Sequence, residues 1–595
     1  MARHRHALTG SILAALLAGT ALAAPAQGLE GDWKGALNGG AQGVIHFVLH
    51  IRTGKDGPSA SMDIVDAGRF GLPFAITREG RKVSVRNAAG TIGYDGELSE
   101  DGASMQGEFS QGPALIPMAF ARSSEAPSAP VGARTVAPAP KAGTFPSDAE
   151  IRKALARRID QERRGVGIVV GVISPGGRSI VAYGVTEAGG KQPVGGKTLF
   201  EVASITKTFI SLILQDMALK GEVSLDDPVG KYLNGHPSPP DRDGRPITLA
   251  ELATHRSGLP QNLVAGNETP SEVYSGATEA KLDAYLATYK SPGPSAPAWS
   301  YSNLGVGMLG LALSHRAGTD LPTLVRQRVI EPLGMTSTVF GAPPPGPGVA
   351  VGHDASLNPL PPSLKLGAAE AAAGEIRSNA EDMLTYLAAE LGLRPTSLEP
   401  AMRAMLATDY GPGESGMRQE LGWMSLDVGG RRIFTHSGAT FGQRAFIAFD
   451  PKAREGVVVL SNAESTTGTD DIGLWLMGAT PLQALPPAAP ALKQPGAEAV
   501  VPLSAAEARA FAGDYRLTEH ITLTVVYDGQ QMQLRSTTRG TPGPALPMVF
   551  HGRGSFSVPV ANASVTFQTG PGPTAGGFVL RNPAGELHAS RMASR

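Results

Sequence analysis

The sequence predicts an α+β protein in three parts, with a central domain that mixes strands and helices between two small all-β domains. Two Ala- and Pro-rich stretches without helical periodicity, 123–146 and 481–502, are predicted linkers that divide the chain. The parts outside them carry short alternating runs separated by turn signals, which is typical of strands. The part between them, 147–480, has hairpin patterns near both ends and helical patterns in the middle, which favours an α+β fold. At 595 residues the chain exceeds the size of a single core, in keeping with several domains.

The first residues, 1–23, have the three parts of a secretory signal peptide. Arg3 and Arg5 supply a basic start, Ala7 to Ala21 form a short apolar run, and Ala21-Leu22-Ala23 has the small-x-small pattern of a cleavage site. The apolar run is too short for a membrane span, and a buried N-terminal helix is the alternative. We therefore expect an exported protein, periplasmic or secreted, with no integral membrane segment after the signal is removed.

Both flanking domains are predicted to be small and accessory, without chemistry of their own. In the first, 28–122, alternating runs such as 44–51 favour a small sandwich or barrel, and the opening GDWKGAL (31–37) resembles the first strand of lipocalin-like barrels. In the last, 503–595, a short amphipathic helix precedes a hairpin with an Asp-Gly turn, 521–536. We expect a second lipocalin-like barrel there.

The central domain is predicted to carry strands at both of its ends, joined in one sheet. Residues 165–185 form a predicted hairpin around a Pro-Gly-Gly turn, and 444–464 form a second one. Helical patterns lie between them, at 203–220, 302–316 and 380–392.

Composition excludes several classes of function. Lys+Arg 52 against Asp+Glu 53 gives no reason to expect a nucleic-acid partner. The absence of cysteine rules out disulfides, thiolate catalysis and zinc–thiolate sites. The 12 histidines are scattered without an H-E-x-x-H pattern, so no metal and no other cofactor is expected. The G-x-G-x-x-G match at 305–310 does not close a strand, so it indicates close helix packing rather than a dinucleotide site. The sequence contains no G-x-S-x-G motif, which argues against an α/β-hydrolase.

Ser204 and Lys207, in the apolar stretch FEVASITKTFI (200–210), are the first candidates for chemistry. Three residues apart on a helix, their side chains share one face, so the ammonium group can lie beside the hydroxyl. A serine hydroxyl is a poor nucleophile until a neighbour takes its proton, and a buried lysine with a lowered pKa can take it. The alternative is a surface helix with an exposed serine and lysine, which the apolar flanks disfavour.

Tyr301 and Asn303, in the run SYSN, are the second candidates. A phenol can relay protons where cationic neighbours stabilise the phenolate, and an asparagine offers both a donor and an acceptor. The alternative is a turn that caps a helix starting near Asn303.

His436, Ser437 and Gly438 form the third candidate motif, in an apolar strand-like run before the second hairpin. A strand there could line a cleft, with Gly438 letting a substrate backbone approach and the Ala439 N–H placed to bind an oxyanion. Taken alone, His436 is more simply explained as a core or turn histidine.

Together the three motifs resemble those of the serine β-lactamase and penicillin-binding-protein superfamily. Their order and spacing are similar to its class C branch, which also holds DD-carboxypeptidases, D-aminopeptidases and esterases. The segments ITLAELATHRSGLP (247–260), EPLGMTST (331–338) and GEIRSNAEDMLTYL (374–387) add to the resemblance, which extends over 150–470. It implies a mixed antiparallel sheet beside an all-helical subdomain, with the active site in the cleft between them.

The resemblance also implies a role for each candidate residue. Ser204 would be the nucleophile that forms an acyl-enzyme, and Lys207 and Tyr301 would share the proton transfers, with the identity of the base left open. Asn303 would hold Lys207 and a substrate amide. The N–H groups of Ser204 and Ala439 would form the oxyanion hole.

The third motif departs from class C β-lactamases, which usually carry lysine where this chain has His436. A histidine with an ordinary pKa is mostly neutral at pH 7, so it lacks the full positive charge that faces a β-lactam carboxylate, although Ser437 could still bond a carboxylate or carbonyl. The leading expectation is an exported serine hydrolase that acts on D-amino-acid-containing peptides, peptidoglycan fragments among them, or on small esters.

Two alternatives stay open. The first is a class C-type β-lactamase, and the second, of another class, is a non-catalytic protein that binds peptidoglycan or glycan through its β domains. The loops 275–300 and 341–367 are expected to shape specificity, and the oligomeric state is left open.

Overall fold

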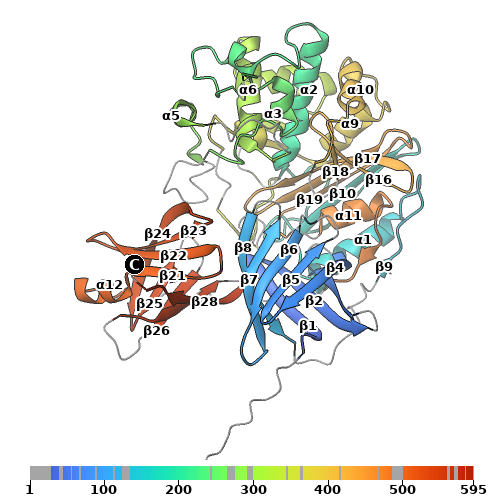
Figure 1. Cartoon of the computed structure of the whole chain (residues 1–595). Coiled ribbons are helices and arrows are strands. Elements are labelled where there is room, and N and C mark those ends of the chain that lie inside the picture. Colours follow the sequence, from blue (N-terminus) through green and yellow to red (C-terminus); the bar gives the residue numbers. More distant parts are fainter. Residues whose placement is uncertain are drawn as a thin grey trace, which may run out of the picture.

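The computed structural model arranges the chain as two closed barrels and a central α+β domain, which confirms the predicted fold class (Figure 1). The predicted signal peptide and part of each predicted linker lie outside the residues that the structure describes. Those residues are 28–38, 44–54, 57–65, 69–87, 90, 92–111, 114–123, 135–241, 244–263, 275–290, 299–342, 346, 348–354, 356–361, 366–413, 417–465, 468–485, 500–558, 563–568, 574–582 and 584–593.

The first domain is a closed antiparallel barrel of eight strands, in which neighbours in sequence pair and β1 returns to β8. Alternate side chains fill its interior, among them the fully buried Trp33, Leu49 and Phe120. Of the two architectures that the sequence left open, the structure therefore has the barrel. Its strands are β1 (Gly31–Asn38), β2 (Val44–Gly54), β3 (Gly57–Ile64), β4 (Arg69–Glu79), β5 (Lys82–Asn87), β6 (Ile92–Leu98), β7 (Ser104–Gln111) and β8 (Ala114–Arg122).

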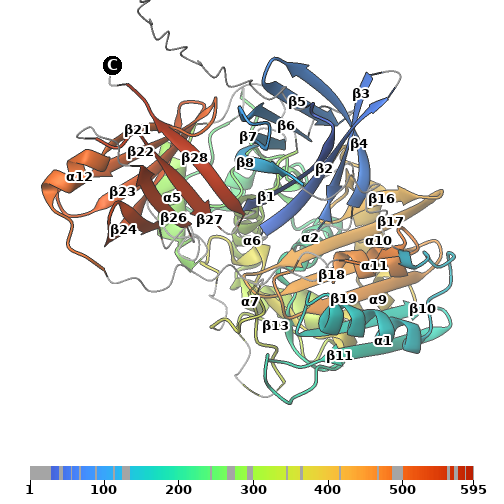
Figure 2. The same ribbon diagram turned by 90° about the horizontal axis from the view of Figure 1, so that it is seen from below.

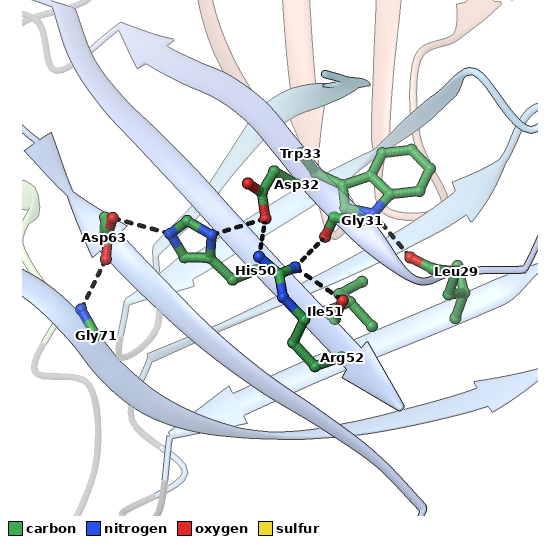
Figure 3. Close-up of polar contacts among 9 residues, drawn as sticks. All are labelled: Leu29, Gly31, Asp32, Trp33, His50, Ile51, Arg52, Asp63 and Gly71. Atoms are coloured by element: carbon green, nitrogen blue, oxygen red, sulfur yellow. Dashed lines mark hydrogen bonds and ion pairs between the residues drawn. The ribbon is translucent and has the colours of Figure 1, made fainter. Parts of the chain in front are cut away.

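A buried ionic cluster ties the first three strands of this barrel together (Figure 3). His50 of β2 contacts Asp32 of β1 through Nδ1 at 2.8 Å and Asp63 of β3 through Nε2 at 2.9 Å, and Arg52 reaches Asp32 at 2.6 Å. Burial by itself lowers the pKa of His50, but the hydrogen bonds and charges of Asp63 and Asp32 outweigh it, so the net pKa is raised. Both ring nitrogens are engaged, which indicates a structural role.

Replacing His50 by glutamine is expected to destabilise β1–β3 by about 3 kcal/mol at pH 6, because Asp63 then stays buried without its cation. A pKa that is raised on folding stabilises below the ordinary value near 6.5, and this stabilisation disappears as the pH rises through the folded pKa. Hydrogen–deuterium exchange of peptides from β1–β3 should therefore show protection that falls with pH in the wild type relative to the variant. Equal pH dependence in the two proteins would contradict this account.

The last domain is a second closed antiparallel barrel of eight strands, preceded by the predicted short helix. The predicted Asp-Gly hairpin is confirmed as β22 and β23. Its elements are α12 (Ala505–Phe511), β21 (Gly513–Arg516), β22 (Ile521–Tyr527), β23 (Met532–Thr538), β24 (Thr541–Gly552), β25 (Ser555–Val558), β26 (Ala563–Gln568), β27 (Gly577–Asn582) and β28 (Gly585–Arg591).

The two barrels pack side by side, with β28 next to β8 (Figures 1 and 2). Gln106 of β7 donates to the carbonyl oxygens of Leu517 at 2.9 Å and His588 at 2.8 Å. Glu108, which is buried, accepts from the His520 backbone N–H and faces its Nδ1, both at 2.8 Å. Polar side chains of β7 therefore join the barrels.

The central domain is built on a seven-stranded antiparallel sheet in the order β11-β10-β19-β18-β17-β16-β15. Strand β10 pairs with both β11 and β19, which confirms that one sheet joins strands from the two ends of the domain. Both predicted hairpins are present. The strands are β10 (Gly167–Ser174), β11 (Gly177–Gly184), β15 (Arg418–Gln419), β16 (Met424–Val428), β17 (Arg431–Ala439), β18 (Arg444–Asp450) and β19 (Glu455–Ser461).

Helices cover both faces of this sheet, because its buried strands are apolar on both sides. Helices α1 (Asp148–Ala156) and α11 (Asp470–Leu476) share a core with one face. The other face shares a core with the helical part, which lies at one end of the molecule (Figure 1). Its helices are α2 (Thr206–Leu219), α3 (Leu249–Ala253), α5 (Glu279–Thr288), α6 (Asn303–Ala317), α7 (Leu321–Val325), α8 (Glu331–Leu333), α9 (Ala380–Glu390) and α10 (Glu399–Ala407).

No helix within the described ranges is long and apolar enough to cross a lipid bilayer.

Three short strands form a separate small sheet in the order β12-β14-β13. They are β12 (Phe200–Glu201), β13 (Val339–Phe340) and β14 (Ile376–Ser378).

The two predicted linkers differ from expectation where the structure describes them, because their ends belong to the central domain. Strand β9 (Thr135–Ala137) pairs with β20 (Leu482–Gln483). Trp475 of α11 donates its indole N–H to the carbonyl oxygen of Pro138 at 3.0 Å. Short Ala- and Pro-rich segments lack helical periodicity yet can still add strands to a domain edge, which composition alone does not show.

Candidate active site

The three sequence motifs converge where α2 and α6 begin beside β17, the geometry that the resemblance implied. A cavity of about 100 Å³ lies there between the sheet and the helical part. The residues lining it include Ser204, Asn303, Glu370, Ala373, Glu375 and Ala439.

Ser204 lies in a single 3-10 turn, Ala203–Ile205, and Lys207 lies in the first turn of α2 that follows. Lys207 Nζ is 3.0 Å from Ser204 Oγ and donates to the Ala373 carbonyl oxygen at 2.7 Å. Lys207 is 1% exposed, whereas Ser204 is only partly buried. The preceding residue, Ala203, has φ +47°, a left-handed conformation that costs a non-glycine residue about 1–2 kcal/mol. The hydroxyl is thus presented to the cavity on a strained turn, with the amine behind it.

Burial lowers the pKa of Lys207 to about 7, against the opposing charge of Glu370, which raises it. The ammonium also lies 4.9 Å from the centre of the Tyr301 ring. Near neutral pH the lysine therefore exchanges readily between the charged form and the neutral form that can accept the serine proton.

The kcat/KM for a neutral ester is expected to rise with pH through about 7, because only the neutral amine of Lys207 can accept the Ser204 proton. Removing the negative charge of Glu370, as in Glu370→Gln, should move this rise to lower pH. A pH–rate profile of both proteins with an uncharged substrate measures the shift. A rise displaced to higher pH in the variant would contradict the assigned electrostatics.

Tyr301 is positioned by a histidine that the sequence analysis quoted only as part of a matching segment. The His255 ring lies 4.3 Å from the Tyr301 ring, centre to centre, and its Nδ1 accepts the backbone N–H of Ser302 at 3.2 Å. Burial, and next the charge of Lys207, hold the pKa of His255 well below its ordinary value, so the imidazole is neutral. It therefore supports the tyrosine by packing.

Asn303 is at the first position of α6, as expected, but its contacts differ from those that the resemblance implied. Its Nδ2 donates to Asn262 Oδ1 at 2.9 Å, while the carbonyl oxygen of Ala373 holds Lys207. Ser302 caps the helix by accepting the Gly305 N–H at 2.8 Å. Asn303 still lines the cavity.

His436 lies on β17 with its side chain on the helical face of the sheet. Its Nδ1–H donates to the Ser437 carbonyl oxygen at 2.8 Å, which leaves Nε2 as an acceptor. Burial, followed by the charge of Lys207, lowers the pKa of His436 to about 3. The position that carries lysine in class C β-lactamases is therefore neutral here.

Ser437 does not face the site, contrary to the prediction. Its hydroxyl donates to Asp470 Oδ2 of α11 at 2.7 Å, on the opposite face of the sheet. Successive side chains of a strand point to opposite faces, so His436 and Ser437 cannot both line the cavity.

Gly438 allows a close approach, as predicted, but the approaching group is the protein's own backbone. A Cβ atom at this position would lie 2.1 Å from the Val202 carbonyl oxygen. Strand β17 thereby contacts the turn that carries Ser204 and brings Ala439 to the same cavity. The two residues of the expected oxyanion hole, Ser204 and Ala439, therefore line one cavity.

One wall of the cavity comes from residues 366–377, most of which the sequence analysis assigned no role. Gly307 of α6 permits this, because a Cβ there would lie 1.9 Å from the Ala369 carbonyl oxygen. The tight contact confirms the packing interpretation of the glycine-rich match at 305–310. It places Ala373 on Lys207 and Glu370 beside the cavity.

Glu370, in this wall of the cavity, is a buried acidic residue with a raised pKa. It is fully buried, and its Oε1 accepts the Leu263 N–H at 2.5 Å, while Oε2 has no hydrogen-bond partner among the described residues. Burial raises the pKa of Glu370 to about 7. The run of alanines around it offered no sequence signal beyond the single acidic residue.

The two loops predicted to shape specificity are described only in part. Leu366, at the end of the second, lines the cavity, while residues 291–298, 343–345, 347, 355 and 362–365 lie outside the described ranges. Within those ranges, no group of three or more His, Asp or Glu side chains could hold a metal ion.

A serine beside a buried lysine, a tyrosine against that lysine and a strand closing the cavity define an active-site serine hydrolase. The Beta-lactamase family model matches residues 152–480, more than half of the chain, and the chain belongs to this family.

Its relatives include two kinds of enzyme. A beta-lactamase of Lysobacter lactamgenus is 27% identical over 351 residues, covering 53% of this chain and 87% of that protein. The D-alanyl-D-alanine-carboxypeptidase/endopeptidase AmpH of Escherichia coli (strain K12) is 33% identical over 181 residues, covering 30% of this chain and 46% of that protein. The solved D-alanine carboxypeptidase AmpC from Burkholderia cenocepacia aligns with 25% identity and a TM-score of 0.47, over 56% of this chain and 99% of that one.

The family match and the two sequence relatives confirm the superfamily, its class C-like branch and a serine hydrolase that acts through an acyl-enzyme. Because the relatives are named both as β-lactamases and as carboxypeptidases, they do not establish which substrate this protein cleaves.

Proposed function

We propose that this protein is an exported hydrolase that cleaves D-amino-acid-containing peptides or small esters through an acyl-enzyme on Ser204. The observation that carries the proposal is the 3.0 Å contact between Ser204 Oγ and Lys207 Nζ beside a cavity. Burial lowers the pKa of this lysine to about 7, which suits a group that takes a proton at neutral pH.

The reaction begins with transfer of the Ser204 hydroxyl proton, directly to Lys207 or through Tyr301. Ser204 Oγ then bonds to the substrate carbonyl carbon, and the N–H groups of Ser204 and Ala439 stabilise the resulting oxyanion. The tetrahedral intermediate collapses as the leaving amine or alcohol takes back a proton, which leaves an ester on Ser204. A water molecule, deprotonated by the same groups, hydrolyses this ester and restores the hydroxyl.

The choice of peptides or esters over β-lactam antibiotics is supported by the third motif. His436 is neutral because burial and the neighbouring Lys207 lower its pKa to about 3, and Ser437 is bonded to Asp470 behind the sheet. Neither side chain offers a charge or a free hydroxyl to the carboxylate of a penicillin. Efficient β-lactam hydrolysis is therefore the second candidate, supported by the names of relatives such as the Lysobacter enzyme.

Intact-mass measurement after incubation with benzylpenicillin tests the proposal, with Ser204→Ala as the matched control. A stable adduct on the wild type alone is the expected result and indicates slow deacylation, as in a penicillin-binding peptidase. A transient adduct with hydrolysed drug would favour the β-lactamase instead. If neither adduct nor drug loss occurs, labelling by a serine-reactive fluorophosphonate distinguishes an esterase or aminopeptidase from an inactive site.

Export and the accessory role of the barrels belong to the same proposal. The basic, apolar and small-residue pattern of 1–23 supports a cleaved signal peptide, so the N-terminal sequence of the exported protein should begin at Ala24. The barrels contact each other through Gln106 and Glu108, and we assign them no catalytic group.

A further inference from the structure

We propose that the cavity beside Ser204 is an acidic subsite that binds a substrate ammonium group next to the cleaved bond, with Glu370 as its counter-ion. The inference rests on the proposed function, since it names the charge of the substrate of that same serine hydrolase.

The first argument is the unsatisfied oxygen of Glu370. The side chain is 0% exposed and lines the cavity that holds Ser204, yet Oε2 has no hydrogen-bond partner within the described ranges. Oε1 is already engaged by the Leu263 N–H. A buried carboxylate oxygen without a donor is unfavourable, and a ligand that supplies donors removes the penalty. An ammonium group supplies up to three N–H donors together with the complementary charge.

The second argument is the balance of charge around the cavity. Three glutamates line it, and two of them, Glu201 and Glu375, share Arg377 at 3.2 and 3.8 Å. The charge of Lys207 acts on Glu370, and Lys207 must be neutral when it accepts the serine proton. At that moment the described residues lining the cavity include three glutamates and one arginine. A substrate cation restores the balance and also favours the neutral lysine by repulsion.

The third argument concerns where the ammonium lies. Because the cavity holds only about 100 Å³, a group bound in it is close to the Ser204 hydroxyl. This fits a residue with a free α-amine whose own carbonyl carbon is attacked.

Binding to a full-length Ser204→Ala variant tests the subsite without turnover. Calorimetry should show that D-alaninamide binds at least about tenfold more tightly than N-acetyl-D-alaninamide, which lacks the ammonium. Equal affinity, or tighter binding of the acetylated compound, would overturn the inference. Because this test needs no reaction, its failure is distinguishable from failure of the proposed function, which adduct formation on Ser204 reports.

A matched pair of variants then identifies the counter-ion. Glu370→Gln in the Ser204→Ala background should lower the preference for the amine about tenfold. Glu390→Gln should leave it unchanged. Glu390 is also a buried glutamate, and burial raises its pKa to about 8 against a side-chain hydrogen bond from Tyr386, but it lines a different cavity at the end of α9.

Turnover by enzymes with Ser204 intact separates substrate binding from an indirect role through Lys207. In Glu370→Gln, kcat/KM for D-alanine p-nitroanilide should fall about tenfold relative to kcat/KM for the N-acetyl compound. An equal change for both substrates would assign Glu370 to the positioning of Lys207 alone and overturn the subsite.

Discussion

Replacing Lys207 by methionine is expected to lower kcat/KM by about a thousandfold or more, because the variant cannot accept the Ser204 proton. Methionine fills similar volume, and it removes an ionisable group that is 1% exposed. The free energy of unfolding should therefore stay the same or rise, since burying a charged group is unfavourable. Loss of activity without loss of stability would show that Lys207 contributes to catalysis and not to the stability of the fold.

The measurement is steady-state kinetics with a neutral ester, together with a chemical denaturation curve for each protein. Lys220→Met is the matched control, because Lys220 caps the C-terminal end of the same helix and is 54% exposed. It should retain wild-type activity. A Lys207→Met variant that keeps more than a tenth of the activity, a loss below about 1.4 kcal/mol in the barrier, would exclude Lys207 as a principal proton acceptor.

Replacing Gly438 by alanine is expected to lower kcat/KM by about a hundredfold and to destabilise the domain by about 1–3 kcal/mol. The added Cβ would lie 2.1 Å from the Val202 carbonyl oxygen and 3.3 Å from the Ala203 side chain, so β17 and the Ser204 turn must separate. Separation pulls the Ala439 N–H away from the oxygen that it is proposed to bind. Acylation by a fluorophosphonate should slow in parallel.

The control for this substitution is Gly195→Ala. No atom lies within 4 Å of a Cβ built at Gly195, and its φ is not positive, so the variant should match the wild type in kinetics and stability. If Gly438→Ala also matched the wild type, the close contact between β17 and the nucleophile turn would have no catalytic importance.

The candidate reaction groups could be predicted because their signals are local. Ser204 and Lys207 are one helical turn apart, and Tyr301 precedes a helix with a capping serine, so each motif can be found in a short window. Family resemblance then supplied the step that no local pattern contains, namely that the three motifs meet. The structure brings Lys207 to 3.0 Å from Ser204 and to 4.9 Å from the Tyr301 ring.

Ser437, Gly438 and Asn303 have contacts with distant segments that the sequence analysis did not predict. Asp470 of α11 takes the Ser437 hydroxyl, the Val202 backbone occupies the space beside Gly438, and Asn262 takes the Asn303 amide. A strand pattern predicts that neighbouring side chains point to opposite faces of the sheet, but it does not predict which segments pack on each face.

Glu370 and the His50 cluster were missed for a related reason. Asp32, His50 and Asp63 alternate with apolar residues, which is the ordinary pattern of a solvent-facing strand side, yet they are buried against one another. Glu370 stands alone among alanines, and only its burial beside Ser204 reveals it.

By itself, the sequence predicted the three-part organisation, the two β domains, the helices and hairpins of the central domain, and the candidate residues of a serine hydrolase site. These features depend on periodicity, composition and short motifs, which act over one or a few turns of chain. Only the tertiary structure decided that the β domains close as barrels, which side chains line the cavity, and how far the pKa of Lys207, His436 and Glu370 departs from ordinary values. The physical reason is that burial and charge–charge interactions are set by atoms close in space but far apart in the chain.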